Sequence, residues 1–287
     1  MRLEAAVKAF ADLMVLTFVV SSMLGVGLSL TLSQIIAPLR RARLVVAALV
    51  ANFVVAPLVV VGITKLIPLS EPLTVGLLLL GTAAGAPFLP KIVETAKGDL
   101  AFAVALMVLL LVGTLGYLPL MLPLLLPGVS VSSRKIAQAL LVSMILPLIV
   151  GLFVKARRES LAAGLRPLMS RVSNASVIVA LVLIPVMNYR SLLGIVGSGA
   201  ILAGTLFVGV SFVAGFVLGG PMRESKMVLG FGTAGRNIPA AMLVASQNFD
   251  DPQVAVMIIV VVLLTLFILM PLAVWFGRRS QATEKLR

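Results

Sequence analysis

Apolar segments long enough to cross a membrane follow one another along almost the whole chain. A helix crosses the hydrocarbon core of a bilayer with about 20 apolar residues, and here 61% of the 287 residues are hydrophobic while 11% are charged. We expect nine such segments, joined by short polar connections of which residues 155–171 form the longest. They are residues 13–35, 44–64, 73–90, 100–126, 136–154, 172–187, 193–218, 227–244 and 254–276. The pattern predicts an all-α polytopic membrane protein whose function resides within the bilayer.

Lys and Arg are distributed unequally between these connections. With Lys91 and Arg236 set aside because they fall inside apolar segments, fifteen of the 23 cations lie on one side and six on the other. Since cytoplasmic loops carry the excess of Lys and Arg, we expect an outer N-terminus and residues 278–287 as a cytoplasmic tail. This explains the net charge of +13 without a nucleic-acid partner. The predicted location is the plasma (inner) membrane, with the bilayer as a partner and the oligomeric state left open.

The first apolar segment has a second interpretation, as a secretory signal peptide. Residues 13–35 are longer than the apolar part of such peptides and lack a clean cleavage site, so a membrane span is favoured. The chain contains neither His nor Cys, which excludes disulfides, thiol nucleophiles and imidazole acid–base chemistry. We therefore expect no enzyme, no catalytic residue, no metal site and no cofactor. A membrane-embedded enzyme, sensor or scaffold is the less favoured alternative.

Two of the apolar segments carry nearly the same interruption, about 150 residues apart. GTAAGAPFLP covers residues 81–90 and GTAGRNIP covers residues 232–239. Proline lacks an N–H group and glycine favours irregular backbone, so neither helix is expected to continue. A single break is often only a kink, but a matched pair indicates inverted repeats whose broken helices form a transporter binding site. The helix-break residues are Gly81, Gly85, Pro87, Pro90, Gly232, Gly235 and Pro239.

A second half-helix is expected to begin after each break, with its positive end near the bilayer midplane. The free N–H groups and the dipole of such a helix end favour an anion. Lys91 and Arg236 add full positive charges beside the breaks, where buried cations normally face a cavity or a partner. The predicted cargo is a small organic anion. The predicted substrate-binding residues are Arg236, Asn237, Thr233, Lys91, Thr82 and Asn52.

Several of these residues have simpler interpretations. Lys91 is spaced to pair with Glu94 on one helix face, and Glu94 is also a possible coupling residue. Asp99 and the pair at 250–251 are more typical of helix caps than of ion ligands. GFGTAG at 230–235 matches the dinucleotide fingerprint, but a membrane-length apolar run surrounds it instead of a βαβ unit.

Four segments resemble, in order, the bile acid:sodium symporter family, which includes bacterial and plant organic-anion carriers. They are MLGVGLSLTLSQ at 23–34, ANFVVAP at 51–57, TAKGDLAFAVAL at 95–106 and GTAGRNIPAAMLVA at 232–245. The resemblance implies two inverted repeats, with two crossed broken helices in a core domain and a smaller panel domain. On this template residues 43–127 and 193–277 form the core, and residues 9–37 and 135–190 form the panel. It also implies secondary transport by alternating access.

The resemblance is weakest at the family's sodium ligands. Sodium-coupled members tend to place Ser-Asn in the first broken helix, Glu and Gln in the second, and further hydroxyl groups in the next span. Only Asn52 matches a polar family position, which is a Gln. The other matching positions hold Leu89, Pro90, Phe231, Gly235, Ala103 and Met107.

Two hypotheses follow from this departure. A hard cation such as Na⁺ requires several oxygen ligands, and most of them are replaced here. The first hypothesis is that Lys91 and Arg236 are fixed cations where sodium binds in the family, so that the anion is bound without sodium. The alternative is a conventional sodium- or proton-coupled symporter whose ion site uses backbone carbonyls, Asn52 and Glu94. Sodium is thus a possible but doubted cofactor.

Overall fold

The protein is helical throughout the described part of the chain. The computed structural model describes residues 2–36, 40–126, 133–187, 189, 194–195 and 197–284. Within these residues there is no strand, and seven helical stretches are long and apolar enough to cross a membrane. These stretches are Val7–Ser29, Ala42–Leu66, Leu100–Leu125, Arg134–Arg157, Glu159–Ile184, Ala200–Leu218 and Pro252–Ser280. The expected polytopic membrane protein is therefore confirmed.

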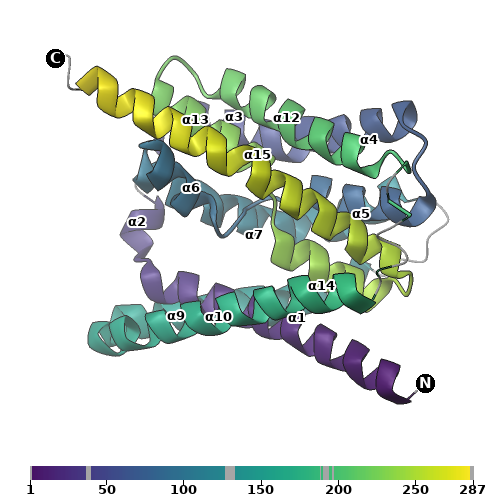
Figure 1. Ribbon diagram of the computed structural model, residues 1–287. Coiled ribbons are helices and arrows are strands. Elements are labelled where there is room, and N and C mark those ends of the chain that lie inside the picture. Colours follow the sequence, from purple (N-terminus) through teal and green to yellow (C-terminus); the bar gives the residue numbers. More distant parts are fainter. Residues whose placement is uncertain are drawn as a thin grey trace.

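The helices are arranged as in Figure 1. Their bounds are α1 (Arg2–Ser29), α2 (Leu32–Ile36), α3 (Ala42–Val50), η2 (Ala51–Val55), α4 (Ala56–Leu66), α5 (Glu71–Thr82), α6 (Leu89–Ala96), α7 (Leu100–Leu125), α8 (Ser133–Leu140), η3 (Leu141–Ile145), α9 (Leu146–Arg157), α10 (Glu159–Met187), α12 (Ala200–Leu218), α13 (Arg223–Ala234), α14 (Ile238–Asn248) and α15 (Pro252–Glu284). The π-helical turns η2 and η3 lie within continuous spans. The second residue after each turn is a proline, Pro57 or Pro147. Proline has no N–H group to donate to the hydrogen-bond ladder of a regular helix.

Both segments with a predicted interruption are split into two helices. The first consists of α5 and α6, and the second of α13 and α14. Together with the seven long stretches, these split segments fall on the nine apolar segments of the sequence. The number of times that the chain crosses a membrane stays a prediction.

Three boundaries differ from the sequence-based expectation. The connection at 155–171 is largely helical, because α10 begins at Glu159 in a stretch of strong helix formers, and Lys155 donates to Glu159 at 2.6 Å. The expected tail at 278–287 continues α15 as far as Glu284. The first segment does not run on to residue 35. It ends at Ser29, and Thr31 and Gln34 form a capping box that starts α2.

The helices form two layers. Helices α1, α9 and α10 pack against one another and form the lower layer of Figure 1. Glycines bring α1 and α9 into backbone contact, since a Cβ added to Gly27 would lie 2.3 Å from the Leu148 oxygen. The broken helices lie in the other layer with α3, α4, α7, α12 and α15.

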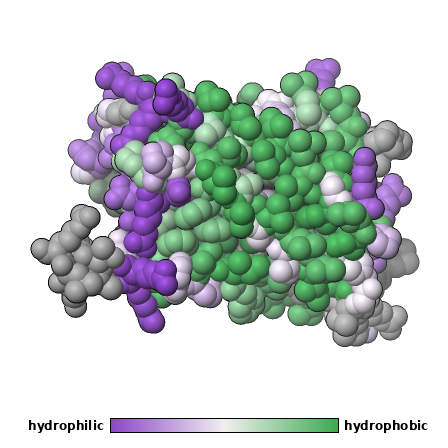
Figure 2. Space-filling model, turned by 90° about the horizontal axis from the view of Figure 1, so that it is seen from above, coloured by the Kyte–Doolittle hydropathy of each residue, from purple (hydrophilic) through white to green (hydrophobic). Residues whose placement is uncertain are grey.

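Basic residues gather at one end of the apolar belt. Arg41 pairs with Asp99, which joins the starts of α3 and α7, and Arg223 donates to the Phe276 carbonyl near the end of α15. Figure 2 shows hydrophilic side chains at both ends of a broad apolar surface, with larger groups at the end where the C-terminus lies. This separation along one axis is typical of a protein embedded in a bilayer.

Candidate functional site

The two broken segments cross where their helices end. The backbone N–H of Asn237 in the second break donates to the Ala83 carbonyl in the first break at 2.8 Å. Helix α5 packs against α14, and α6 packs against α13, so each half of one segment contacts the opposite half of the other. The crossing brings four helix ends to one place.

The first break is fixed by Gly85 and Thr114. Gly85 has φ +87°, and a Cβ added there would lie 2.4 Å from the Leu111 nitrogen, so only glycine fits. The hydroxyl of Thr114 donates to the Ala84 carbonyl and accepts from the Ala84 N–H, both at 2.9 Å. It thereby satisfies backbone groups that the break removes from the helical ladder. Pro90 is the second residue of α6, where an N–H group is dispensable.

The second break is held by Asn237 and Gly235. The side-chain oxygen of Asn237 accepts the Ala240 N–H at 3.1 Å and caps α14, in which Pro239 is the second residue. A Cβ on Gly235 would lie 2.8 Å from the Phe231 carbonyl oxygen, which explains why a glycine stands at the end of α13. The Asn237 side-chain nitrogen is buried and has no hydrogen-bond partner in the described part of the chain.

Arg236 lies at the centre of the crossing and is only 2% exposed. Its Nε donates to the Leu80 carbonyl at 2.8 Å, and Nη2 donates to the Gly81 carbonyl at 2.6 Å. Its Nη1 donates to Asn52 Oδ1 at 3.0 Å and to the Thr233 carbonyl at 3.2 Å. The guanidinium is therefore surrounded by four oxygens of the chain.

Three of these oxygens belong to helix C-termini. Leu80 and Gly81 are in the last turn of α5, and Thr233 is in the last turn of α13. The final carbonyls of a helix lack intrahelical partners and carry partial negative charge. Arg236 therefore joins the C-terminal ends of both broken helices, and in return those ends stabilise a charge that is costly within a membrane.

Asn52 and Thr233 complete this arrangement. The Asn52 side-chain nitrogen donates to the Ala48 carbonyl at 3.0 Å and to the Thr233 hydroxyl at 3.3 Å. Thr82 is also buried, but its hydroxyl donates to carbonyls of its own helix, Leu78 and Leu79. The structure thus brings Arg236, Asn52 and Thr233 together by direct contacts.

Lys91 and Glu94 lie apart from the crossing residues. Lys91 donates to Glu94 at 2.9 Å, and their side chains are 75% and 56% exposed. They occupy the exposed face of α6, whose opposite face is buried. The Lys91–Glu94 pair that the sequence spacing indicated is therefore present, and Lys91 makes no contact with Arg236.

Four of the positions that the resemblance assigns to sodium ligands carry apolar side chains. Leu89, Ala103, Met107 and Phe231 are all buried. The Phe231 ring lies 5.1 Å from the Phe212 ring, measured between centroids. These four positions therefore offer no side-chain oxygen to a cation.

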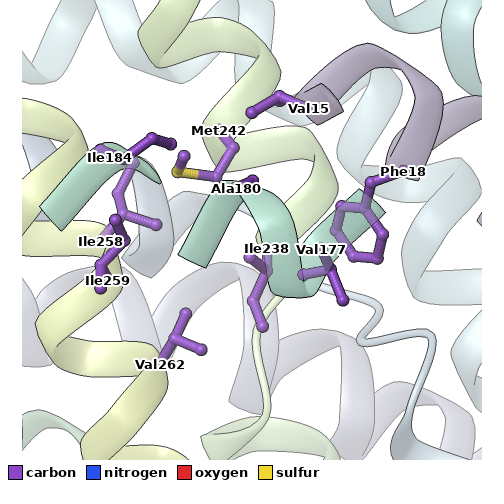
Figure 3. Close-up of a pocket in the computed structure, with 10 residues that line it drawn as sticks. All are labelled: Val15, Phe18, Val177, Ala180, Ile184, Ile238, Met242, Ile258, Ile259 and Val262. Atoms are coloured by element: carbon purple, nitrogen blue, oxygen red, sulfur yellow. The ribbon is translucent and has the colours of Figure 1, made fainter. Parts of the chain in front are cut away.

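An apolar cavity adjoins the second break, between the two layers. Ten apolar residues from α1, α10, α14 and α15 line it, and Figure 3 shows Phe18, Ile184 and Ile238 among them. Ile238 directly follows Asn237, so the cavity begins next to the cap of α14.

Two residues at the crossing escaped sequence reasoning. Thr114 is the first, because a threonine in an apolar span carries no signal of the bonds it makes. The second is Tyr117, whose hydroxyl donates to the Phe53 carbonyl at 2.6 Å. Pro57 lies four residues further along the helix and has no N–H group to donate to that carbonyl. The proline was therefore the available signal.

Comparison with known proteins places the chain in a family. A sequence model described as Sodium Bile acid symporter family matches residues 15–195, which is more than half of the chain. The chain belongs to this family. Members of this family are transporters. This sodium bile acid symporter family member is a multi-pass membrane protein. The match includes the first break but not Arg236. Comparison with curated proteins found no match.

Proposed function

We propose that this family member is a secondary transporter that carries small organic anions by alternating access. The proposed moving parts are a core, residues 43–127 and 193–277, and a panel, residues 9–37 and 135–190. The packing of α1, α9 and α10 as a separate layer supports this division. The basic end of the molecule supports a plasma (inner) membrane orientation with the C-terminus in the cytoplasm and the N-terminus outside.

The observation that carries the proposal is the position of the Arg236 guanidinium. A bound sodium ion requires several oxygen ligands, and Arg236 already takes four oxygens at the crossing, including that of Asn52. The guanidinium acts as a built-in cation in place of sodium. Lys91 is exposed and paired, so its proposed contribution is to attract anions rather than to occupy an ion site.

The cargo binds beside this cation. The N-terminal ends of α6 and α14 face the crossing and favour negative charge. The unpaired side-chain nitrogen of Asn237 offers a donor to an anionic or carbonyl oxygen. The apolar cavity that begins at Ile238 has a volume of about 20 Å³, room for about one water molecule, so it would have to widen as the two layers move apart before it takes the apolar part of the cargo. Thr82 and Thr233 hold the helix ends in place, and Arg236 acts chiefly through its charge because four of its five N–H donors already bond the chain.

Transport assays with purified protein test this function. Uptake of a panel of radiolabelled organic anions is measured in proteoliposomes, with sodium or choline as the external cation and the membrane potential clamped. We expect uptake of at least one anion at the same rate in both media. In choline, Arg236→Ala is expected to abolish this uptake, whereas Lys65→Gln, at an exposed helix end, is expected to leave it unchanged. Anions that never enter above the protein-free control would refute the function.

A conventional sodium-coupled symporter is the second candidate, and the family description favours it. In that case the sodium site would use carbonyls other than those bound to Arg236, with Asn52 shared. Uptake that stops in choline would establish this candidate. Uptake that follows a pH gradient and loses that response in Glu94→Gln would instead indicate proton coupling.

A further inference from the structure

The positions of the charged residues determine how much net charge one transport cycle moves across the membrane. Of its ten acidic residues, eight have described side chains, and none of these is buried. They are Asp12, Glu71, Glu94, Asp99, Glu159, Glu224, Asp250 and Asp251. The half-buried one, Asp99, pairs with Arg41. Arg236 is the sole buried charged residue in the described part of the chain.

This buried charge cannot leave with the cargo. A guanidinium stays protonated under physiological conditions, and its four oxygen partners belong to the chain itself. A sodium ion in the same place would be released on the far side of the membrane. Arg236 instead stays in the protein when the empty carrier reorients. Its contribution to the net charge moved across the membrane in a full cycle is therefore zero.

The hydrogen bonds between the Arg236 guanidinium and the chain also affect how the core can move. Because protein oxygens already stabilise Arg236, the core does not need an anion at the crossing to keep this charge in the membrane. The core is then free to change orientation with or without cargo. That freedom distinguishes a uniporter from an obligatory exchanger, which must carry an anion in both directions.

From these facts, and resting on the proposed function, we infer that the protein carries its anion electrogenically and works as an exporter. The cargo provides the only net charge moved per cycle, so a membrane potential that is negative inside drives the anion outward. A potential of 100 mV acts on one charge with about 2.3 kcal/mol, which corresponds to an outside-to-inside ratio of about 50 for a monovalent anion. A symporter that brings two sodium ions with each anion would be driven inward by the same potential.

Valinomycin-clamped proteoliposomes test the direction of transport. Vesicles without sodium, at equal pH on both sides, are loaded with labelled taurocholate, benzoate or 2-oxobutyrate, and efflux is followed at 0 and 100 mV, negative inside. We expect a transported monovalent anion to approach a ratio of about 50 at 100 mV and to stay near equality at zero potential. Asp12→Asn, which removes the acidic residue of the first candidate span, is expected to keep this response.

The outcomes separate the inference from the function on which it rests. Transport that ignores the potential, or that requires an anion on the opposite side, would overturn electrogenic export while leaving anion transport intact. A potential response that disappears in Asp12→Asn would assign coupling to that carboxylate and also overturn the inference. Transport of no anion at all would overturn the proposed function and the inference together.

Discussion

Replacing Arg236 by alanine should convert the crossing into a sodium-responsive site. The substitution removes the built-in cation and leaves four oxygens directed at the space it occupied. A buried acceptor without its donor costs about 1–3 kcal/mol, so the variant should lose about 4 kcal/mol or more of stability. The same oxygens resemble the ligand set that a hard cation prefers. Sodium should therefore stabilise the variant but not the wild type.

The size of the sodium effect follows from mass action. At a concentration 100 times its dissociation constant, a ligand stabilises the folded state by about 2.7 kcal/mol. For a chain of 287 residues, that corresponds to a rise in melting temperature of about 4–5 °C. The measurement is thermal unfolding of purified protein in detergent, in sodium chloride and in choline chloride at equal ionic strength.

Two further proteins make this experiment decisive. Arg236→Ala combined with Asn52→Ala removes one of the four oxygens and should respond less to sodium than the single variant. Arg236→Lys keeps a cation at the crossing and should show no sodium response. Equal melting shifts for wild type and Arg236→Ala, or no shift for either, would refute the view that Arg236 stands in place of a bound ion.

Three further substitutions test how the crossing is built. Asn52→Ala removes an acceptor of Arg236 and two donated bonds, so we expect transport to fall at least about tenfold, the equivalent of about 1.4 kcal/mol; unchanged uptake would contradict its role. Gly85→Ala should cost about 3 kcal/mol or more, because its positive φ is strained for alanine and the added Cβ would lie 2.4 Å from the Leu111 nitrogen, whereas Gly62→Ala, which meets no atom within 4 Å, should be neutral or stabilising in a melting assay. Thr114→Val should lower stability by about 3 kcal/mol because it leaves two backbone groups unpaired; a loss no larger than that of Thr205→Val, whose hydroxyl bonds its own helix, would argue against this.

The helix breaks were predictable because their cause is local. Glycine and proline interrupt the helical ladder wherever they stand, so GTAAGAPFLP and GTAGRNIP predicted both splits. The start of α2 was equally local, since TLSQ is a capping box, but a continuous apolar run concealed it. Hydropathy alone does not reveal the start of α10, because its first turns contain charged and polar residues, although the residues from Glu159 onward favour a helix.

The partners of Arg236 were beyond sequence reasoning. They are carbonyls of Leu80 and Gly81, some 155 residues away, and every residue has a carbonyl. Like Arg236, Lys91 is a cation beside a helix break in the sequence, yet its side chain is exposed. Its surroundings held the explanation: residues 89–96 form an amphipathic helix whose apolar face leaves Lys91 and Glu94 on the opposite side.

The most direct test of the central claim is the initial rate of organic-anion uptake by wild-type proteoliposomes when sodium is replaced by choline at constant membrane potential. If the Arg236 guanidinium stands in place of bound sodium, the rate will be the same in both media. A rate that collapses in choline would contradict this account and return the chain to sodium-coupled symport.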